Sequence, residues 1–533
     1  MKIIKKYFPL FFIFGIVLAL YFPVFSLYFS QDDFFHLNAS RVTGSWTGFI
    51  RLLGFPEWAE RGYAFYRPLF REVYYFFLTK AFGINPLPYR LASFGVHFGC
   101  IIMVFVLMKK FFKRRLLAFL TALFYGIATP QIGTFYYHAG GIQASGATLF
   151  FLAALYSYWQ FLEKDKINYW LLTLGCFLGA IASCEIIVAI LPFTLFSLEV
   201  LLAKKFSKDW FKGVFFHLFP LGFILVVYLY LDLTLIGLPQ DVSYSPVLSI
   251  RKISNAFVWY FGWGLGLPDM LVDFVGPGLR LNPKLMLWWG SYFKIIFPAF
   301  FLTILMLFFS GVYLFFKNRK IFKNKQSLLL RNKQSLLLRN KQSLLLRNKY
   351  FWFLLLWFPI ALSPVIILPW HKFLHYLNPA LPALFGVVFF VVLGAYDLLK
   401  KKNKLVARAY LGLFCFLLFL LSFVSIKLEE KTYWAINRGK IAKNLIEQMK
   451  ETYPSLPQGA VLYFENDPQY PFIAEEWGGS STQAYYALSG KDAAQLIYHD
   501  PTLKVYYEDI EKPLGPPAGG EEIFSIVARI NQK

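Results

Sequence analysis

The chain has 533 residues, of which 57% are hydrophobic and 20% aromatic, and its mean hydropathy is +0.50. Soluble globular domains contain about 45–50% apolar residues, so this composition excludes an ordinary soluble enzyme and favours one large helical membrane domain. The net charge of +24 does not indicate nucleic-acid binding, because the basic clusters lie between apolar segments, as the positive-inside bias of membrane proteins produces.

Apolar segments taken in chain order predict eleven membrane spans. Lysines at the N-terminus and basic clusters at 109–115, 204–212, 318–349 and 400–404 occupy every second gap, which places them on the cytoplasmic side. The first apolar run is longer than that of a cleavable signal peptide, so we interpret it as a retained span. Residues 254–275 form either an additional span or a re-entrant segment. The predicted spans are 7–29, 88–108, 116–132, 141–162, 168–184, 186–203, 211–232, 288–316, 350–369, 377–399 and 405–426.

Two predicted outer loops, 30–87 and 233–287, are long enough to carry a site. The first contains FYRPLFREVYYFFLTKAF, which is typical of helices that lie at the membrane interface. In the cytoplasmic loop 318–349, residues 324–347 are three copies of NKQSLLLR. This period fits no stacked repeat, so replication slippage is the favoured explanation and contact with anionic headgroups the alternative.

The segment 427–533 differs in composition, with 11 of the 54 Lys and Arg residues but 15 of the 30 Asp and Glu residues. Its pattern predicts a helix over TYWAINRGKIAKNLIEQMKETYP, strands at GAVLYFEN and KVYYED, and a loop at PLGPPAGG. Because eleven is an odd number of spans and the N-terminus is predicted to be cytoplasmic, this tail is expected on the extracytoplasmic side of the membrane. The predicted fold is therefore a polytopic α-helical protein, with a transmembrane domain over 1–426 and a small extracytoplasmic α/β module.

An acidic pair, Asp32-Asp33, directly follows the first predicted span. The two carboxylates are either ordinary solvated side chains of a loop or part of a site that uses their charge. A carboxylate here suits transfer to a hydroxyl, because it accepts the proton as the hydroxyl attacks. If the donor is a lipid phosphate, the leaving group develops negative charge and requires cations nearby.

Few ionisable residues outside the cytoplasmic clusters can assist this chemistry. Arg67 and Arg71 lie in the first outer loop, where interfacial snorkelling is the alternative explanation. Between the ninth and tenth spans lie His371, Lys372 and His375. An equally good explanation for these three is that they are ordinary polar residues at the membrane edge. The remaining two candidates are His138 and Glu185. The alternative explanation for His138 is an ordinary histidine at the membrane interface, and the alternative for Glu185 is a residue that caps or solvates a tight turn.

We predict no cofactor, because the sequence contains neither a nucleotide-binding motif nor an HExxH motif. Acids and histidines on one predicted side of the membrane leave a divalent metal possible.

The acidic pair and the block YRPLFREVYYFFLTKAFGINPLPYRLASFGVHF resemble the GT-C superfamily of lipid-phosphosugar-dependent glycosyltransferases, particularly its protein O-mannosyltransferase-like members. The block is similar to the family's Arg-Pro-Leu, Phe-Gly-x-Asn-Pro turn and late histidine, here Arg67-Pro68-Leu69, 82–86 and His97. SCEIIVAILPF resembles a Ser-Lys-Glu segment, with Cys184 in place of the lysine. KFLHYLNPALP resembles an Arg-Tyr-Leu-Tyr-Leu-Pro segment but has no arginine.

The resemblance implies two long outer loops over a cavity, Asp32 or Asp33 as the general base, and Arg67 as a support for the donor or the loop. It also implies a polyprenyl-phosphate sugar donor, a hydroxyl acceptor, inversion at the anomeric carbon and a location in a prokaryotic inner membrane. The alternatives are a lipid-linked sugar transporter, or flippase, and an O-antigen polymerase or ligase. A transporter would show internal repeats and charges at mid-membrane depth, which the sequence does not suggest.

Overall fold

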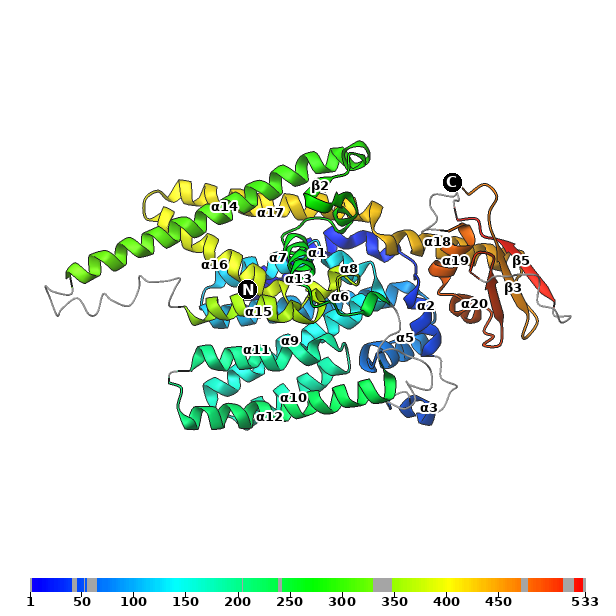
Figure 1. The fold of residues 1–533 in the computed structure, drawn as a ribbon, viewed down its shortest axis with the longest axis horizontal. Coiled ribbons are helices and arrows are strands. Elements are labelled where there is room, and N and C mark those ends of the chain that lie inside the picture. The colour runs from blue at the N-terminus through cyan, green and yellow to red at the C-terminus, as the bar shows by residue number, and fades with distance from the viewer. Residues whose placement is uncertain are drawn as a thin grey trace. The chain divides into compact units, whose positions relative to one another are not determined.

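The computed structural model describes residues 2–40, 46–51, 53–54, 65–203, 205–237, 242–328, 348–470, 478–510 and 522–530 (Figure 1). The chain divides into two compact units. Unit 1 comprises Met1–Leu20, Val96–Ile132 and Ala144–Glu429, and unit 2 comprises Tyr21–Gly95, Gly133–Gln143 and Glu430–Lys533. Most of the NKQSLLLR repeat lies outside the described residues.

Each of the eleven predicted spans coincides with a helix. Eight of these helices, within the described part of the chain, are long and apolar enough to cross a membrane. The eight are α1 (Lys2–Tyr21), α6 (Pro86–Phe112), α9 (His138–Lys164), α12 (Lys208–Leu231), α14 (Lys284–Leu328), α15 (Lys349–Ile366), α16 (Leu381–Lys400) and α17 (Lys404–Thr432).

The other three predicted spans are apolar helices shorter than a full crossing, namely α7 (Arg115–Gly126), α10 (Ile167–Ile181) and α11 (Ile186–Leu202). The predicted span 116–132 ends early because Pro130 lacks an N–H and disfavours the helical conformation of the preceding residue. The ambiguous segment 254–275 contains α13 (Ile250–Gly264) and the 3₁₀ helix η5 (Asp269–Phe274), and α13 has only 15 residues. A complete additional span is therefore not formed there.

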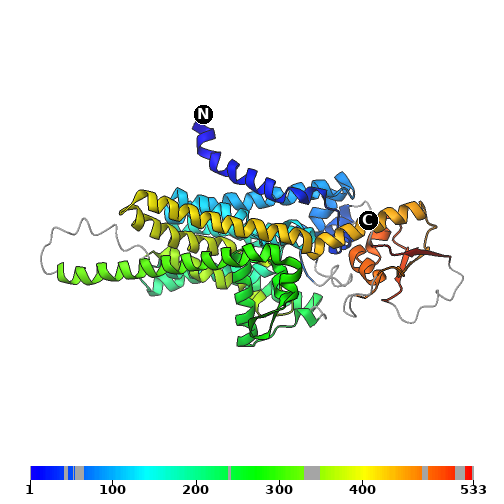
Figure 2. The same ribbon diagram turned by 90° about the horizontal axis from the view of Figure 1, so that it is seen from above.

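Unit 1 is built from long helices that run alongside one another (Figure 2). α16 packs against α7, α14 and α15, and α11 packs against α10, α12 and α15. The guanidinium of Arg114 donates two hydrogen bonds to the carboxylate of Asp397, at 2.8 and 3.0 Å. A short antiparallel pair, β1 (Val275–Gly276) with β2 (Arg280–Leu281), lies in the segment predicted to form the second outer loop.

Unit 2 combines the segment predicted to form the first outer loop with the C-terminal tail. The loop contributes α2 (Asp32–Ala39), α3 (Trp46–Arg51), the π-helical turn η2 (Leu69–Val73) and α5 (Tyr74–Phe82). The tail contributes α18 (Trp434–Thr452), α19 (Ser480–Leu488), α20 (Asp492–Ile497) and a parallel three-stranded sheet of order β4-β3-β5. The strands are β3 (Val461–Glu465), β4 (Lys504–Tyr507) and β5 (Ile523–Val527). The predicted helix and two strands are confirmed, whereas β5 was not predicted.

The first outer loop and the tail share one apolar core. Phe34 and Tyr75 from the loop, with Phe29 just before it, are buried in the same cluster as Met449 and Leu462 from the tail. Polar contacts reinforce it: the side-chain amide of Asn38 donates to α20, to Asp492 at 2.9 Å and to Gln495 at 3.1 Å. The compact unit thus extends well beyond the predicted module 427–533, because the helix that carries the acidic pair is packed on the tail.

Candidate active site

The acidic pair forms the first turn of α2, where the exposed N–H dipoles of a helix favour negative charge. The residue before it, Gln31, has φ = +46°, a conformation that costs a non-glycine residue on the order of 1–3 kcal/mol. Two contacts from the tail hold Gln31 there. Its N–H donates to the carbonyl of Ala487 at 3.0 Å, and its side-chain oxygen accepts a hydrogen bond from Arg438. The tail therefore fixes the direction in which α2 begins.

Asp33 is completely buried. One carboxylate oxygen accepts the N–H of Ser30 at 3.0 Å, and the other accepts the hydroxyl of Tyr75 at 3.4 Å. Burial raises the pKa of Asp33 to about 6, although the nearby guanidinium of Arg90 opposes the shift. These contacts make Asp33 an internal anchor of the turn.

Asp32 is only half-buried. Its carboxylate accepts a hydrogen bond from the hydroxyl of Tyr137, which lies just before α9. Burial raises the pKa of Asp32, while the Tyr137 hydrogen bond and the charges of Arg438 and Arg67 oppose the increase. Of the two acids, Asp32 is the more exposed residue.

Arg67 joins the site through a short polar chain. Its guanidinium donates to the side-chain oxygen of Gln143 at 2.6 Å, and the amide nitrogen of Gln143 lies 3.2 Å from Nε2 of His36. Burial lowers the pKa of His36, and the nearby charges of Arg71 and Arg67 act in the same direction, so the imidazole is neutral. The positive charge near Asp32 is thus arginine charge rather than histidine charge.

Arg71 has a different environment although it lies one helical turn after Arg67. It is 4% exposed, its Nε donates to Glu72 at 2.9 Å, and its Nη2 donates to the carbonyl of Phe65 at 2.6 Å. These contacts bind the π-helical turn to the preceding chain, which makes Arg71 an internal stabiliser of the loop.

His138 and Arg90 occupy the interior of unit 2. His138 is buried, with Nδ1 3.0 Å from the hydroxyl of Ser93 and Nε2 3.2 Å from the hydroxyl of Tyr74. Arg90 is also completely buried and donates to the carbonyls of Phe135 and Tyr28, both at 3.0 Å. Arg90 therefore supports the segment that leads into α2, and His138 joins α9 to α5 and α6.

Three other predicted candidates lie in unit 1. Lys372 is half-buried, and the charges of Asp269 and Asp273 partly offset the lowering of its pKa by burial. His375 is 5% exposed and lies against Tyr376, with a ring-centre separation of 4.5 Å. Glu185 is half-buried at the N-cap of α11 but makes no side-chain capping hydrogen bond.

Sequence reasoning missed a second acidic group, which includes Asp269, Asp273 and Glu429. The carboxylate of Glu429 accepts the N–H of Asp269, and burial raises the pKa of the Asp269 side chain. The signal was available in GLPDMLVDF, because two acids interrupt an apolar stretch of the segment 233–287.

His97, the late histidine of the block that resembles the GT-C pattern, is buried in unit 1. Its Nε2 lies 3.2 Å from the carbonyl of Gly126, and its ring stacks on Tyr125. Among the described residues, no group of three or more His, Cys, Asp or Glu side chains is placed to hold a metal ion.

The close approach of Gly141 to α8 (Gln131–Phe135) yields a testable prediction. A Cβ at Gly141 would lie 2.1 Å from the carbonyl oxygen of Thr134, so the backbone must shift. We expect Gly141→Ala to destabilise the protein by about 1–3 kcal/mol, the usual cost of overpacking, and to displace neighbouring Tyr137 from Asp32. Thermal unfolding of the purified protein measures the first effect, and the catalytic rate measures the second.

Gly95→Ala is the matched control, because a Cβ at Gly95 meets no atom within 4 Å in the middle of α6. It should leave the protein equally or slightly more stable, since alanine favours a helix over glycine. Equal melting temperatures for the two variants would contradict the proposed close packing.

No protein-family model matches the chain, and no curated protein matches it. Among solved structures, the chain is similar to the crystal structure of ArnT from Cupriavidus metallidurans bound to undecaprenyl phosphate. The TM-score is 0.38 and the sequence identity is 12%, with 93% of this chain and 86% of that chain covered. A likeness at this level assigns neither a substrate nor a mechanism.

Proposed function

We propose that the chain transfers a glycosyl group from a polyprenyl-phosphate-linked sugar to a hydroxyl acceptor at the extracytoplasmic membrane face. The acceptor is a protein, a lipid or a glycan, and the transferred sugar is a hexose or a pentose. One observation carries the proposal: the half-buried residue Asp32 directly follows the first span, with Tyr137 bonded to its carboxylate and arginine charge close by. The family resemblance of the residues around Arg67 supports the same reaction.

In the proposed reaction, the acceptor oxygen forms a bond to the anomeric carbon while the bond from that carbon to the phosphate oxygen breaks. The electron pair of the broken bond leaves with the polyprenyl phosphate, and the hydroxyl proton passes to the carboxylate of Asp32. Attack opposite the departing phosphate inverts the configuration at the anomeric carbon.

Asp32 suits the role of base better than Asp33. Asp32 is half-buried, whereas Asp33 is fully enclosed and both of its carboxylate oxygens already accept hydrogen bonds. A general base must reach the proton that it removes, either directly or through one water. Asp33 then acts as a positioning residue, because it holds the turn from which Asp32 projects.

Arg67 and Arg438 are the cations whose charge acts on Asp32. A guanidinium binds phosphate oxygens with two parallel donors and stabilises the charge that develops on a leaving phosphate. Arg438 is held over the ring of Trp434 at 4.9 Å and over that of Tyr486 at 5.0 Å, which orients it in the tail. We assign the donor phosphate to this pair of arginines.

The direct test incubates the purified protein with a panel of polyprenyl-phosphate sugars and a mixture of hydroxyl acceptors. We expect release of free polyprenyl phosphate, with one equivalent of sugar on an acceptor. Movement of intact donor across a proteoliposome membrane without phosphate release would support a transporter instead. Neither release nor acceptor modification with any donor in the panel would count against the transferase.

The pH dependence of kcat/KM tests the role of Asp32. The base must be ionised, so kcat/KM should fall about tenfold per pH unit below its pKa. Because burial raises the pKa of Asp32, this acidic limb should lie above the ordinary aspartate value of about 3.9. Arg67 lowers that pKa, so Arg67→Gln should move the limb to higher pH, measured from pH 4.5 to 8.

Lys80→Gln removes one positive charge from an exposed position in α5 and serves as the control for this shift. It should leave the limb where it is in the unmodified protein. If Arg67→Gln does not move the acidic limb, or if Lys80→Gln moves it equally, the assignment of Asp32 as the base next to Arg67 is contradicted.

A further inference from the structure

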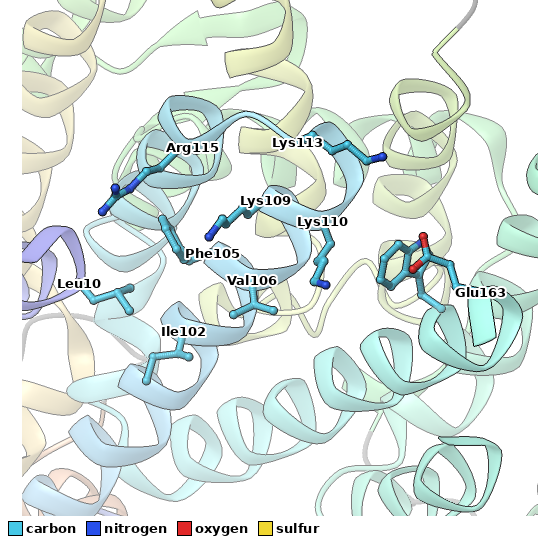
Figure 3. A pocket seen from close by; sticks show the side chains of 10 residues that line it. Leu10, Ile102, Phe105, Val106, Lys109, Lys110, Lys113, Arg115 and Glu163 are labelled. Carbon is cyan, nitrogen blue, oxygen red and sulfur yellow. The ribbon is translucent and has the colours of Figure 1, made fainter. Parts of the chain in front are cut away.

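A cavity of about 780 Å³ lies at the end of α6 in unit 1, on the side that the basic clusters predict to be cytoplasmic. Its lining combines apolar side chains with four basic ones. Figure 3 shows Lys109 and Lys110 beside Val106, with Arg115 toward one side and Glu163 toward the other. The lining consists of Leu10, Ile102, Phe105, Val106, Lys109, Lys110, Lys113, Arg115, Trp159 and Glu163.

The charge of this lining is strongly unbalanced, with four basic residues and one acid. Lys109, Lys110 and Lys113 are exposed and form no ion pair with an acidic side chain in the described ranges. The ammonium group of Lys110 lies 5.7 Å from the ring centre of Trp159, which holds it against the wall. Arg114 differs from them, because its guanidinium is already bonded to Asp397.

A second groove of about 520 Å³ begins at Arg115 and follows α1 and α7. Its other lining side chains are all apolar, and the rings of Phe8 and Phe12 in it are 61% and 47% exposed. Arg115 borders both spaces. A cationic cavity thus meets an apolar groove at one residue.

We propose that this site binds an anionic diacyl phospholipid of the adjacent leaflet. The phosphate contacts Lys109, Lys110 and Arg115, and an acyl chain lies along the groove of Phe8 and Phe12. Basic pockets between membrane helices bind anionic headgroups in this manner, with each lysine near the surface strengthening binding about fivefold. The lipid is distinct from the sugar donor, because this end of α6 lies on the opposite predicted side of the membrane from Asp32.

Native mass spectrometry of the full chain in detergent, with phosphatidylglycerol as the probe, measures this binding. The double variant Lys109→Gln/Lys110→Gln should weaken the affinity roughly thirtyfold. Lys401→Gln/Lys402→Gln is the matched control, since it removes the same charge from exposed residues after α16 that do not line the cavity, and the affinity should stay within about twofold. Val106→Trp, which fills the cavity and keeps every cation, should also weaken binding.

Three results would overturn the proposal. Equal weakening by the two double variants would show general surface attraction, and equal affinity for phosphatidylcholine or phosphatidylethanolamine would show that headgroup charge is not selected. Displacement of the lipid by an equal concentration of inorganic phosphate would show a site for the free anion. If the variant Lys109→Gln/Lys110→Gln has a lowered melting temperature, Val106→Trp decides the outcome.

Discussion

Asp32→Asn should reduce kcat/KM for glycosyl transfer by about 10²–10⁴-fold, the usual contribution of a general base, without loss of the fold. Asparagine is nearly isosteric, and its side-chain oxygen still accepts the hydroxyl of Tyr137. What it loses is the ability to take the acceptor proton. The measurement is the initial rate of polyprenyl phosphate release with a donor that the unmodified protein uses.

Asp33→Asn is the matched comparison, because it makes the same chemical change at the adjacent position. The amide retains an oxygen for the N–H of Ser30, and Tyr75 can accept from its nitrogen, so we expect a loss of less than about tenfold. A greater loss for Asp33→Asn than for Asp32→Asn would reverse the two roles. The rates are compared below the melting temperature of every variant, so that they report chemistry, because Asp33→Asn also removes a charge that acts on buried Arg90.

Arg90→Met should lower the free energy of unfolding by about 3–5 kcal/mol, since it removes the buried cation whose charge acts on Asp33 and leaves that carboxylate enclosed without a compensating charge. It also leaves the carbonyls of Phe135 and Tyr28 without their donor. Unfolding by SDS in mixed micelles measures this difference.

A double-mutant cycle separates the charge from the two carbonyl contacts. In the Asp33→Asn background no buried charge remains unpaired, so Arg90→Met should cost about 1–3 kcal/mol less than in the unmodified chain. Arg114→Met provides the control, because its ion pair with Asp397 is 28% and 46% exposed and such pairs contribute about 0–1 kcal/mol. Strict additivity of Arg90→Met and Asp33→Asn would disprove the coupling.

The helices of unit 1 were predictable because apolar run length is a local property of the sequence. The ends of the shorter helices were less predictable, since they depend on single residues such as Pro130. The tail helix and two strands also followed from local pattern. β5 has five residues, four of them apolar around Ser525, and this segment is too short for its pattern to distinguish a strand from a buried turn.

The site was only partly predictable for a different reason. Asp32, Arg67 and His138 were candidates because charged or polar residues beside apolar spans are conspicuous, and all three lie in unit 2. Tyr137 and Arg438 are ordinary in their own segments, and only the tertiary fold brings them to Asp32. The positive φ of Gln31 likewise depends on contacts with the tail, which no local pattern contains.

The packing of α2 on the tail has a consequence for biosynthesis. Arg438 follows Gln31 by 407 residues, and the partners of Asn38 come still later. A ribosome therefore completes the acidic pair long before it makes the residues that orient it. A nascent or prematurely terminated chain can insert its spans while its acidic pair is still unordered, so the site that we propose for transfer forms as one of the last events of maturation.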